Sequence, residues 1–203
     1  MTSGTRTPPQ PERRWLLAAA LAGALLATAV PARAAGFDLQ ALMALIAQRK
    51  SGEARFTEER FVSTLDTPLR SSGTLSFSAP DRFVRRTLEP RPESMEFDGN
   101  NLVLKRGGRT RQLALDAVPE LAALVDALRG TLNGDAGALQ KHFSTSVSGG
   151  PAKWVLQLTP TDARLAGQVR QLEIVGQGPD LRSVALQLAG GDHSLMLIDP
   201  PRR

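Results

Sequence analysis

The chain has 203 residues, which is enough for one domain with a sizeable core, and 41% of them are hydrophobic. It contains no cysteine, which excludes disulfides, zinc–thiolate sites, cysteine nucleophiles and a lipid anchor on an N-terminal cysteine. The formal net charge is +5, and part of this excess lies at the start of the chain.

Residues 1–34 are predicted to be a secretory signal peptide. Arg13-Arg14 precede an apolar run at 15–30, and Ala32-Arg33-Ala34 supplies small residues at the two positions that a signal peptidase reads. The run is shorter than the roughly 20 residues that cross a bilayer, which favours cleavage after Ala34 over a membrane anchor. The arginine pair leaves twin-arginine export open beside ordinary Sec export.

Cleavage would remove four arginines and one glutamate, which lowers the net charge from +5 to +2. A charge of this size does not indicate nucleic-acid binding. Two basic clusters remain, and they fit either an anionic partner, such as a lipid headgroup, or a solvated sheet face that discourages edge pairing. Their members are Arg82, Arg85, Arg86 and Arg91, and Lys105, Arg106, Arg109 and Arg111.

A helix is predicted over residues 37–50, with Asp38 as its cap and Ser51-Gly52 as its end. Its apolar residues recur at helical spacing: Leu39, Leu42, Met43 and Ile46. We expect this helix to plug the concave side of a sheet. A strand at 54–64 follows, and the odd spacing of Phe56 and Phe61 predicts a bulge in it.

Residues 73–115 predict a meander of antiparallel strands, because apolar residues alternate with polar ones between turn signals. The turns are expected at Ala79-Pro80-Asp81, Glu89-Pro90-Arg91-Pro92, Asp98-Gly99 and Gly107-Gly108. The same-face pairs are Leu75 with Phe77, Met95 with Phe97, Leu102 with Leu104, and Leu113 with Leu115.

A second helix is predicted from Val118-Pro119-Glu120 to Gly130, and a short helical turn at 135–142. About four extended runs follow, with alternating pairs or triplets of apolar residues. These are Trp154, Leu156 and Leu158; Leu172 and Ile174; Val184, Leu186 and Leu188; and Leu195 and Leu197. An antiparallel sheet interrupted by short amphipathic helices indicates an α+β fold with the helices on one face.

No constellation for catalysis is visible in the sequence. Asp192-His193-Ser194 has the residue types of a triad, but neighbours on a strand point to opposite faces and cannot relay a proton. The same argument separates Glu58 from Glu59. No nucleophile elbow, metal-binding or phosphate-binding motif appears, so we expect no enzyme, cofactor or metal site.

The hairpin region resembles the LolA family of periplasmic outer-membrane lipoprotein carriers. The matching pieces are GTLSFSAPDRF, EPRPES and DGNNL, with Phe56 and Arg60 upstream and Leu158-Thr159-Pro160 downstream. The resemblance implies one carrier domain over 35–203, a half-open antiparallel β-barrel of about ten to eleven strands, with short helices covering a concave apolar face that holds acyl chains.

The resemblance and the alternation together assign the candidate site. The lipid-binding cavity is predicted to be lined by Leu75, Phe77, Phe83, Met95, Phe97, Leu104 and Trp154, with Leu102 left out as a rim position. The lid is predicted to be the second helix, through Leu121, Leu124, Val125 and Leu128. Family carriers latch their lid with an arginine where this chain has Ala79, so the latch is absent here or replaced, for which Arg82 is a candidate.

The implied function is a non-enzymatic periplasmic carrier that shields acyl chains between an inner-membrane exporter and an outer-membrane acceptor, as a monomer. Two alternatives stay open. One is a carrier of a glycolipid or lipid-linked pigment, and the other is a lipid-sensing module of an envelope-stress regulator with the same fold. Periodicity alone does not distinguish a lined cavity from a filled core.

Overall fold

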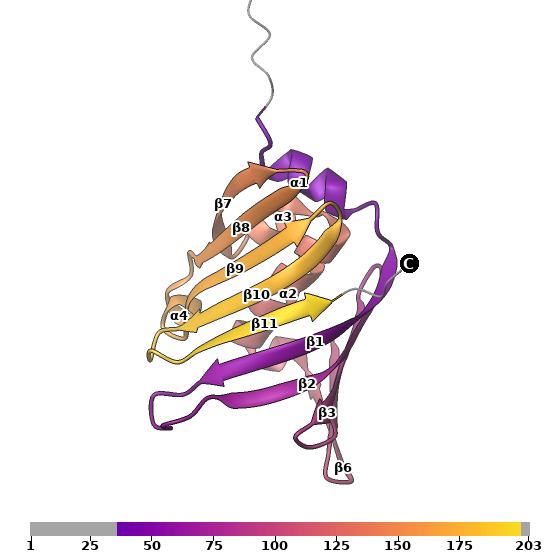
Figure 1. Ribbon diagram of the computed structural model, residues 1–203, viewed down its shortest axis with the longest axis vertical. Coiled ribbons are helices and arrows are strands. Elements are labelled where there is room, and N and C mark those ends of the chain that lie inside the picture. Colours follow the sequence, from indigo (N-terminus) through magenta and orange to yellow (C-terminus); the bar gives the residue numbers. More distant parts are fainter. Residues whose placement is uncertain (1–35, 200–203) are drawn as a thin grey trace, which may run out of the picture. The chain divides into compact units, whose positions relative to one another are not determined.

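The computed structural model describes residues 36–199, and its main element is one antiparallel sheet with helices on one face (Figure 1). The chain divides into two units after Gly36, and every element described here belongs to the second. The predicted signal peptide lies outside the described residues.

The sheet has eleven strands in the order β6-β5-β4-β3-β2-β1-β11-β10-β9-β8-β7, so each half is a meander and β1 pairs with β11. The edge strands β6 and β7 do not pair with each other, which leaves the barrel open. The α+β, half-open barrel predicted from the sequence is confirmed. The strands are β1 (Ser51–Phe61), β2 (Leu69–Ser78), β3 (Arg82–Glu89), β4 (Glu93–Asp98), β5 (Asn101–Arg106), β6 (Arg109–Ala114), β7 (Phe143–Gly150), β8 (Lys153–Pro160), β9 (Val169–Gln177), β10 (Asp180–Leu188) and β11 (His193–Asp199).

The helices are α1 (Leu39–Ile46), η1 (Leu115–Ala117), α2 (Pro119–Asn133), α3 (Ala136–Gln140) and α4 (Ala163–Ala166). Helix α1 is capped by Asp38, whose carboxylate accepts the Ala41 N–H at 2.9 Å, as predicted. Helix α2 has proline in its first turn and ends at Gly134, which adopts the left-handed conformation with φ +72°. A Cβ at Gly134 would collide with the carbonyl oxygen of Met43, so glycine also permits the close contact between α1 and α2.

Two apolar cores form on the helix-covered face of the sheet. The larger core joins α1, α2, α3 and α4 to strands β7–β10, and its largest members include Trp154, Phe143, Leu42 and Met43. The smaller core lies over the β3–β6 meander, where Val125 of α2 packs on Phe97, Leu102 and Leu115. Helix α2 therefore contacts both halves of the sheet, and the surface between the two cores is left for the site described below.

Several local predictions are wrong. Strand β1 pairs in continuous register with β2 and β11, and Phe61 simply points to the outer face, where its ring stacks on His193. Irregular register occurs instead between β2 and β3 and between β9 and β10. Leu113 and Leu115 do not share a strand, because Leu115 begins η1 and is buried while Leu113 is 40% exposed on β6.

The end of the second helix was also mispredicted. Gly130 lies inside α2, where it is buried against Ala138 and Leu139 of α3, so the helix runs to Asn133 and has 15 residues. Glycine permits this close helix–helix approach and does not end the helix.

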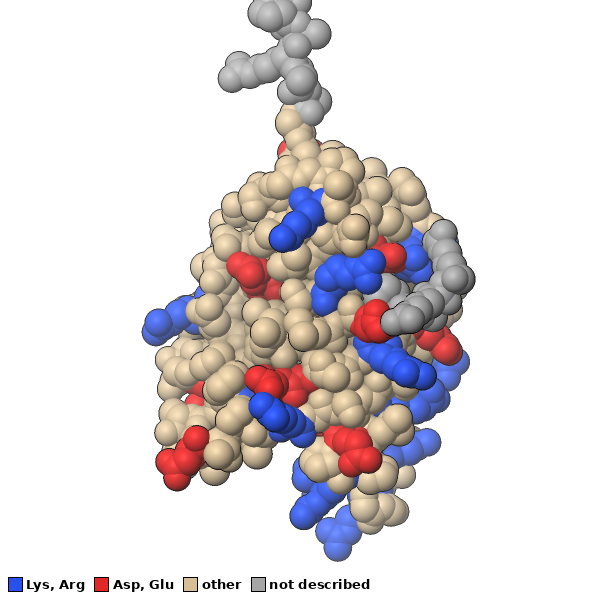
Figure 2. All heavy atoms as spheres, in the orientation of Figure 1, with Lys and Arg blue, Asp and Glu red and all other residues tan. Residues whose placement is uncertain are grey.

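The outer face of the sheet carries both signs of charge, interspersed among uncharged residues (Figure 2). Leu195 and Leu197 of β11 share this face and are 43% and 53% exposed, whereas the inward residues of β11 are Met196 and Ile198. The two basic clusters do not form one uninterrupted positive surface, because Arg82 pairs with Glu96 at 2.7 Å and Arg106 with Glu93 at 3.7 Å.

Candidate functional site

A cavity of about 300 Å³ lies between the concave face of the sheet and helices α1 and α2. Its walls are mostly apolar side chains from β1, β2, β3, β4, β10 and β11, with Ile46 from α1 and Leu128 and Leu132 from α2. These include Ala54, Leu75, Phe77, Phe83, Met95, Leu181, Val184, Met196 and Ile198. Small-molecule sites span about 300–1,000 Å³, so the volume suits one modest apolar group without any movement of the walls.

Four of the seven predicted cavity residues line this space: Leu75, Phe77, Phe83 and Met95. They meet because β2, β3 and β4 are neighbours, and Phe77 pairs with Phe83, which in turn pairs with Phe97. Leu75 is buried, while Phe77, Phe83 and Met95 are half-buried and so retain surface toward the cavity.

Phe97 and Leu104 do not line the cavity. Both pack in the smaller core beneath α2, Phe97 as a buried member and Leu104 at its margin. Leu102, which was interpreted as a rim position, is only 2% exposed and belongs to the same core. The alternation assigned these residues to the correct face, but it did not show that α2 would cover this part of it.

Trp154 is also a core residue and not part of the cavity wall. It is 0% exposed in the larger core, and its ring lies against Gly176, its partner on β9. The indole N–H donates to the carbonyl oxygen of Gly178 at 2.9 Å. Because Gly176 has no Cβ, the indole can lie flat on the sheet, which is why it reaches no open space.

Of the four predicted lid residues, only Leu128 lines the cavity. Val125 is buried in the smaller core, Leu121 packs beside it, and Leu124 packs against the larger core. Leu132, which also lines the cavity, was missed because it lies beyond the predicted end of the helix.

Two side chains of α2 bond the helix to the turns of the meander. Arg129 donates to the carbonyl oxygen of Gly99, and Asn133 donates to the carbonyl oxygen of Pro80. The second bond lies next to Ala79, the position of the family's latch arginine. Arg82 is not a replacement latch, since its guanidinium pairs with Glu96 on the neighbouring β4 strand.

Charged side chains lie at two places along the apolar wall, and neither place was predicted from the sequence. Arg85 of β3 lines the cavity, and its Nη2 donates to Glu58 Oε2 at 2.5 Å and to Ser71 Oγ at 3.3 Å. Glu58 is only 7% exposed. Elsewhere in the cavity wall, Arg49 pairs with Asp180 at 2.5 Å. Glu58 lies two positions after Phe56 on β1, so the alternation of this strand already places a carboxylate on the inward face. This was the signal in the sequence that pointed to a buried charge in the wall.

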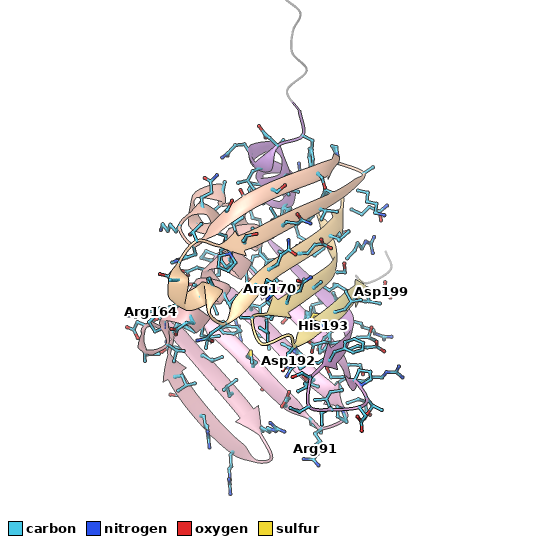
Figure 3. The ribbon with its side chains drawn as sticks, turned by 90° about the vertical axis from the view of Figure 1, so that its left-hand side faces the viewer. Arg91, Arg164, Arg170, Asp192, His193 and Asp199 are labelled. Carbon is cyan, nitrogen blue, oxygen red and sulfur yellow. The ribbon has the colours of Figure 1, made fainter. Side chains whose placement is uncertain are left out.

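The residues of the rejected triad have structural roles. Asp192 accepts the Ser63 N–H at 2.9 Å, which joins the turn after β1 to the turn before β11. This bond from the Ser63 backbone holds the pKa of Asp192 below its usual value, with a smaller contribution from His193. Figure 3 shows Asp192 and His193 together at this turn. Within residues 36–199, no group of three or more acidic or histidine side chains is placed to hold a metal ion.

The family model for outer membrane lipoprotein carrier protein LolA-like matches residues 29–199. The chain belongs to the LolA-like family. No curated protein sequence matches it. None of the helices in the described part of the chain is long and apolar enough to span a membrane.

Several solved structures are similar to this chain at low sequence identity. A LolA superfamily protein from Nitrosomonas europaea is 11% identical, with a TM-score of 0.43, over 82% of this chain and 94% of that one. A putative outer membrane lipoprotein-sorting domain from Vibrio parahaemolyticus is 10% identical, with a TM-score of 0.40, over 79% and 88%. Lipoprotein LppX of Mycobacterium tuberculosis is 12% identical, with a TM-score of 0.36, over 81% and 97%.

Proposed function

We propose that this LolA-like protein is a non-enzymatic carrier that shields an acyl chain inside the cavity between the sheet and helices α1 and α2. The observation that supports it is the cavity itself. Its apolar wall is formed by Leu75, Phe77, Phe83 and Met95. Helix α2 faces this wall and leaves space over it, because α2 packs against the sheet only in the two cores on either side.

The energetics fit transport of an acyl chain through water. Each methylene moved from water into an apolar cavity is worth about 0.8 kcal/mol, so a chain that is only partly enclosed still binds well. The cavity is at the small end of ligand sites, and a long chain would need α2 to move outward. Movement of α2 would offset part of the binding energy and permit release to an acceptor.

The proposed location is the periplasm, reached after cleavage of the predicted signal peptide following Ala34. The proposed exchange partners are an inner-membrane exporter and an outer-membrane acceptor, as for carriers of this family, and the carrier acts as a monomer. The cargo is an acylated lipoprotein or another acylated lipid, of which glycolipids are one class.

Substitution of Phe77 by aspartate tests the role of the cavity. Phe77 lines the space and is half-buried, so a carboxylate there would be placed in an apolar site and should reduce uptake of a neutral fluorescent acyl ester at least about tenfold. The measurement is a fluorescence titration of the purified variant, with its fold checked by circular dichroism.

Thr74→Asp is the matched control. Thr74 lies three residues earlier on β2, faces the outer side, and pairs with Arg55 and Arg86 on the neighbouring strands, which would accommodate the new charge. Its uptake should equal that of the wild type. If folded Phe77→Asp binds the ester as well as Thr74→Asp does, the cavity is not the binding site.

A further inference from the structure

The ion pair between Arg85 and Glu58 stands on the concave face of the sheet, beside the apolar side chains of Phe56, Leu75 and Met196. Glu58 and Arg85 belong to β1 and β3, and the intervening β2 strand contributes Ser71, which bonds to both. Their side chains are 7% and 19% exposed. Burying two charges costs free energy that their mutual attraction often does not recover, so the pair is not explained by stability alone.

Arg85 is held in a fixed orientation. Its guanidinium lies over the ring of Phe56, with 4.6 Å between its central carbon and the ring centroid, and its Nη2 is occupied by Glu58 and Ser71. Its Nε and Nη1 make no hydrogen bond to any described residue, and the side chain lines the cavity. A planar guanidinium so oriented offers its remaining N–H groups to an oxygen in the cavity.

The charge balance of the cavity argues against a negatively charged head. Arg49 and Arg85 are the positive side chains in the wall, and each is already paired with a carboxylate, Arg49 with Asp180 and Arg85 with Glu58, so the formal charges cancel. Glu58 Oε2 is 2.5 Å from Arg85 Nη2. A carboxylate bonded to Arg85 would be close to that of Glu58, and like charges repel strongly where water is excluded.

A carbonyl oxygen is free of this repulsion. It would accept a hydrogen bond from a charged donor, the stronger kind of hydrogen bond, while Glu58 keeps the site neutral. We propose that Arg85, oriented by Glu58, binds the ester or amide carbonyl at the head of an acyl chain, so that the cavity selects neutral acyl esters and amides over free fatty acids. This assignment rests on the proposed carrier function and names the chemical class of its cargo.

The test is a displacement titration on the full mature chain. The neutral dye N-phenyl-1-naphthylamine is bound first and then displaced by lauric acid or by methyl laurate, at about pH 8 so that the acid is ionised. The two ligands have the same acyl chain and differ in the charge of the head. Methyl laurate should displace the dye at a concentration at least about tenfold lower than laurate, the value of roughly one hydrogen bond to a charged group.

Glu58→Gln removes the negative charge and leaves Arg85 in place. It should strengthen laurate binding relative to methyl laurate by about tenfold or more, because the guanidinium charge is then available to the carboxylate. The control is Glu59→Gln on the outer face of the same strand, where Glu59 pairs with Arg70 at 2.9 Å, and it should leave both affinities unchanged.

A second variant covers the case in which Glu58→Gln unfolds. The double substitution Glu58→Gln/Arg85→Met removes both charges, which buried pairs often tolerate, and should weaken methyl laurate about tenfold while the dye still binds. Equal displacement by laurate and methyl laurate in the wild type, or an unchanged ratio in Glu58→Gln, would overturn the assignment alone. If neither ligand displaces the dye, the carrier function itself is wrong.

Discussion

At the scale of single residues, the structure separates apolar side chains that fill the core from those that line open space. Phe77 and Trp154 each share a strand face with apolar residues two positions away, and nothing in that pattern tells them apart. The difference comes from the partners. Phe77 faces the space beneath α2, whereas Trp154 lies flat on Gly176 and donates its N–H to Gly178. A glycine directly opposite a tryptophan is recognisable only once the strand register is known.

This difference predicts that substitutions at Trp154 and at Gly176 lower the stability of the fold and leave acyl-ester binding intact. Trp154→Ala should lower the free energy of unfolding by about 3–5 kcal/mol, because it leaves a void in a packed core. Gly176→Ala should cost about 1–3 kcal/mol, because a Cβ there would overlap the indole ring. Chemical denaturation measures both. The folded Trp154→Ala variant should bind acyl esters with the affinity of the wild type. A loss of ester binding without a loss of stability would show that Trp154 lines the cavity.

At the scale of elements, helix α2 is the part best placed to act as a lid. It packs on both cores, spans the cavity with Leu128 and Leu132, and is bonded to the meander through Arg129 and Asn133. At 15 residues it is at the length where an isolated helix is marginal, roughly 12–15 residues, so its helicity depends on docking. Opening of α2 therefore costs its contacts with the two cores together with its bonds to the meander.

We therefore predict that loss of the two bonds to the turns opens α2. Arg129→Ala and Asn133→Ala should each speed amide hydrogen exchange across Pro119–Asn133 several-fold in the absence of lipid, because hydrogen bonds of these kinds are worth about 0.5–3 kcal/mol. Bound methyl laurate should slow that exchange again. Ala79→Arg should have the opposite effect and slow cargo exchange, since it places a charged donor next to the turn that Asn133 already holds.

Asp126→Asn is the control on the same helix. Asp126 pairs with His142 at 3.6 Å at a half-exposed site, and such pairs contribute little. Exchange in this variant should match the wild type. Slow exchange that responds neither to lipid nor to the loss of Arg129 and Asn133 would show that α2 is a fixed core helix.

Prediction from the sequence succeeded for most strands and failed for the end of α2 and the inward face of β11. Alternation predicted the meander, its turns and the inward faces of β2, β3 and β4, because a strand with one buried face has a fixed period. It did not predict the helix end, because Gly130 is a contact with α3 and not a cap. It did not predict the inward face of β11 either, since Leu195 and Leu197 outside are as apolar as Met196 and Ile198 inside.

At the scale of the whole molecule, the open sheet explains how a carrier can have both a core and an empty site. Helices α1, α2, α3 and α4 pack with strands β7–β10, and α2 with the β3–β6 meander, and the space is left where the two halves meet around β1, β2 and β11. The stability of the fold then resides in the two cores, and the cavity walls are available for a ligand.

The central claim is that this cavity holds an acyl chain, and native mass spectrometry of the protein purified from the periplasm tests it most directly. The account predicts one acylated molecule bound per chain, with an ester or amide head, and its loss in Phe77→Asp but not in Thr74→Asp. A chain that emerges free of any acylated molecule and takes up no methyl laurate when equilibrated with it would contradict the account.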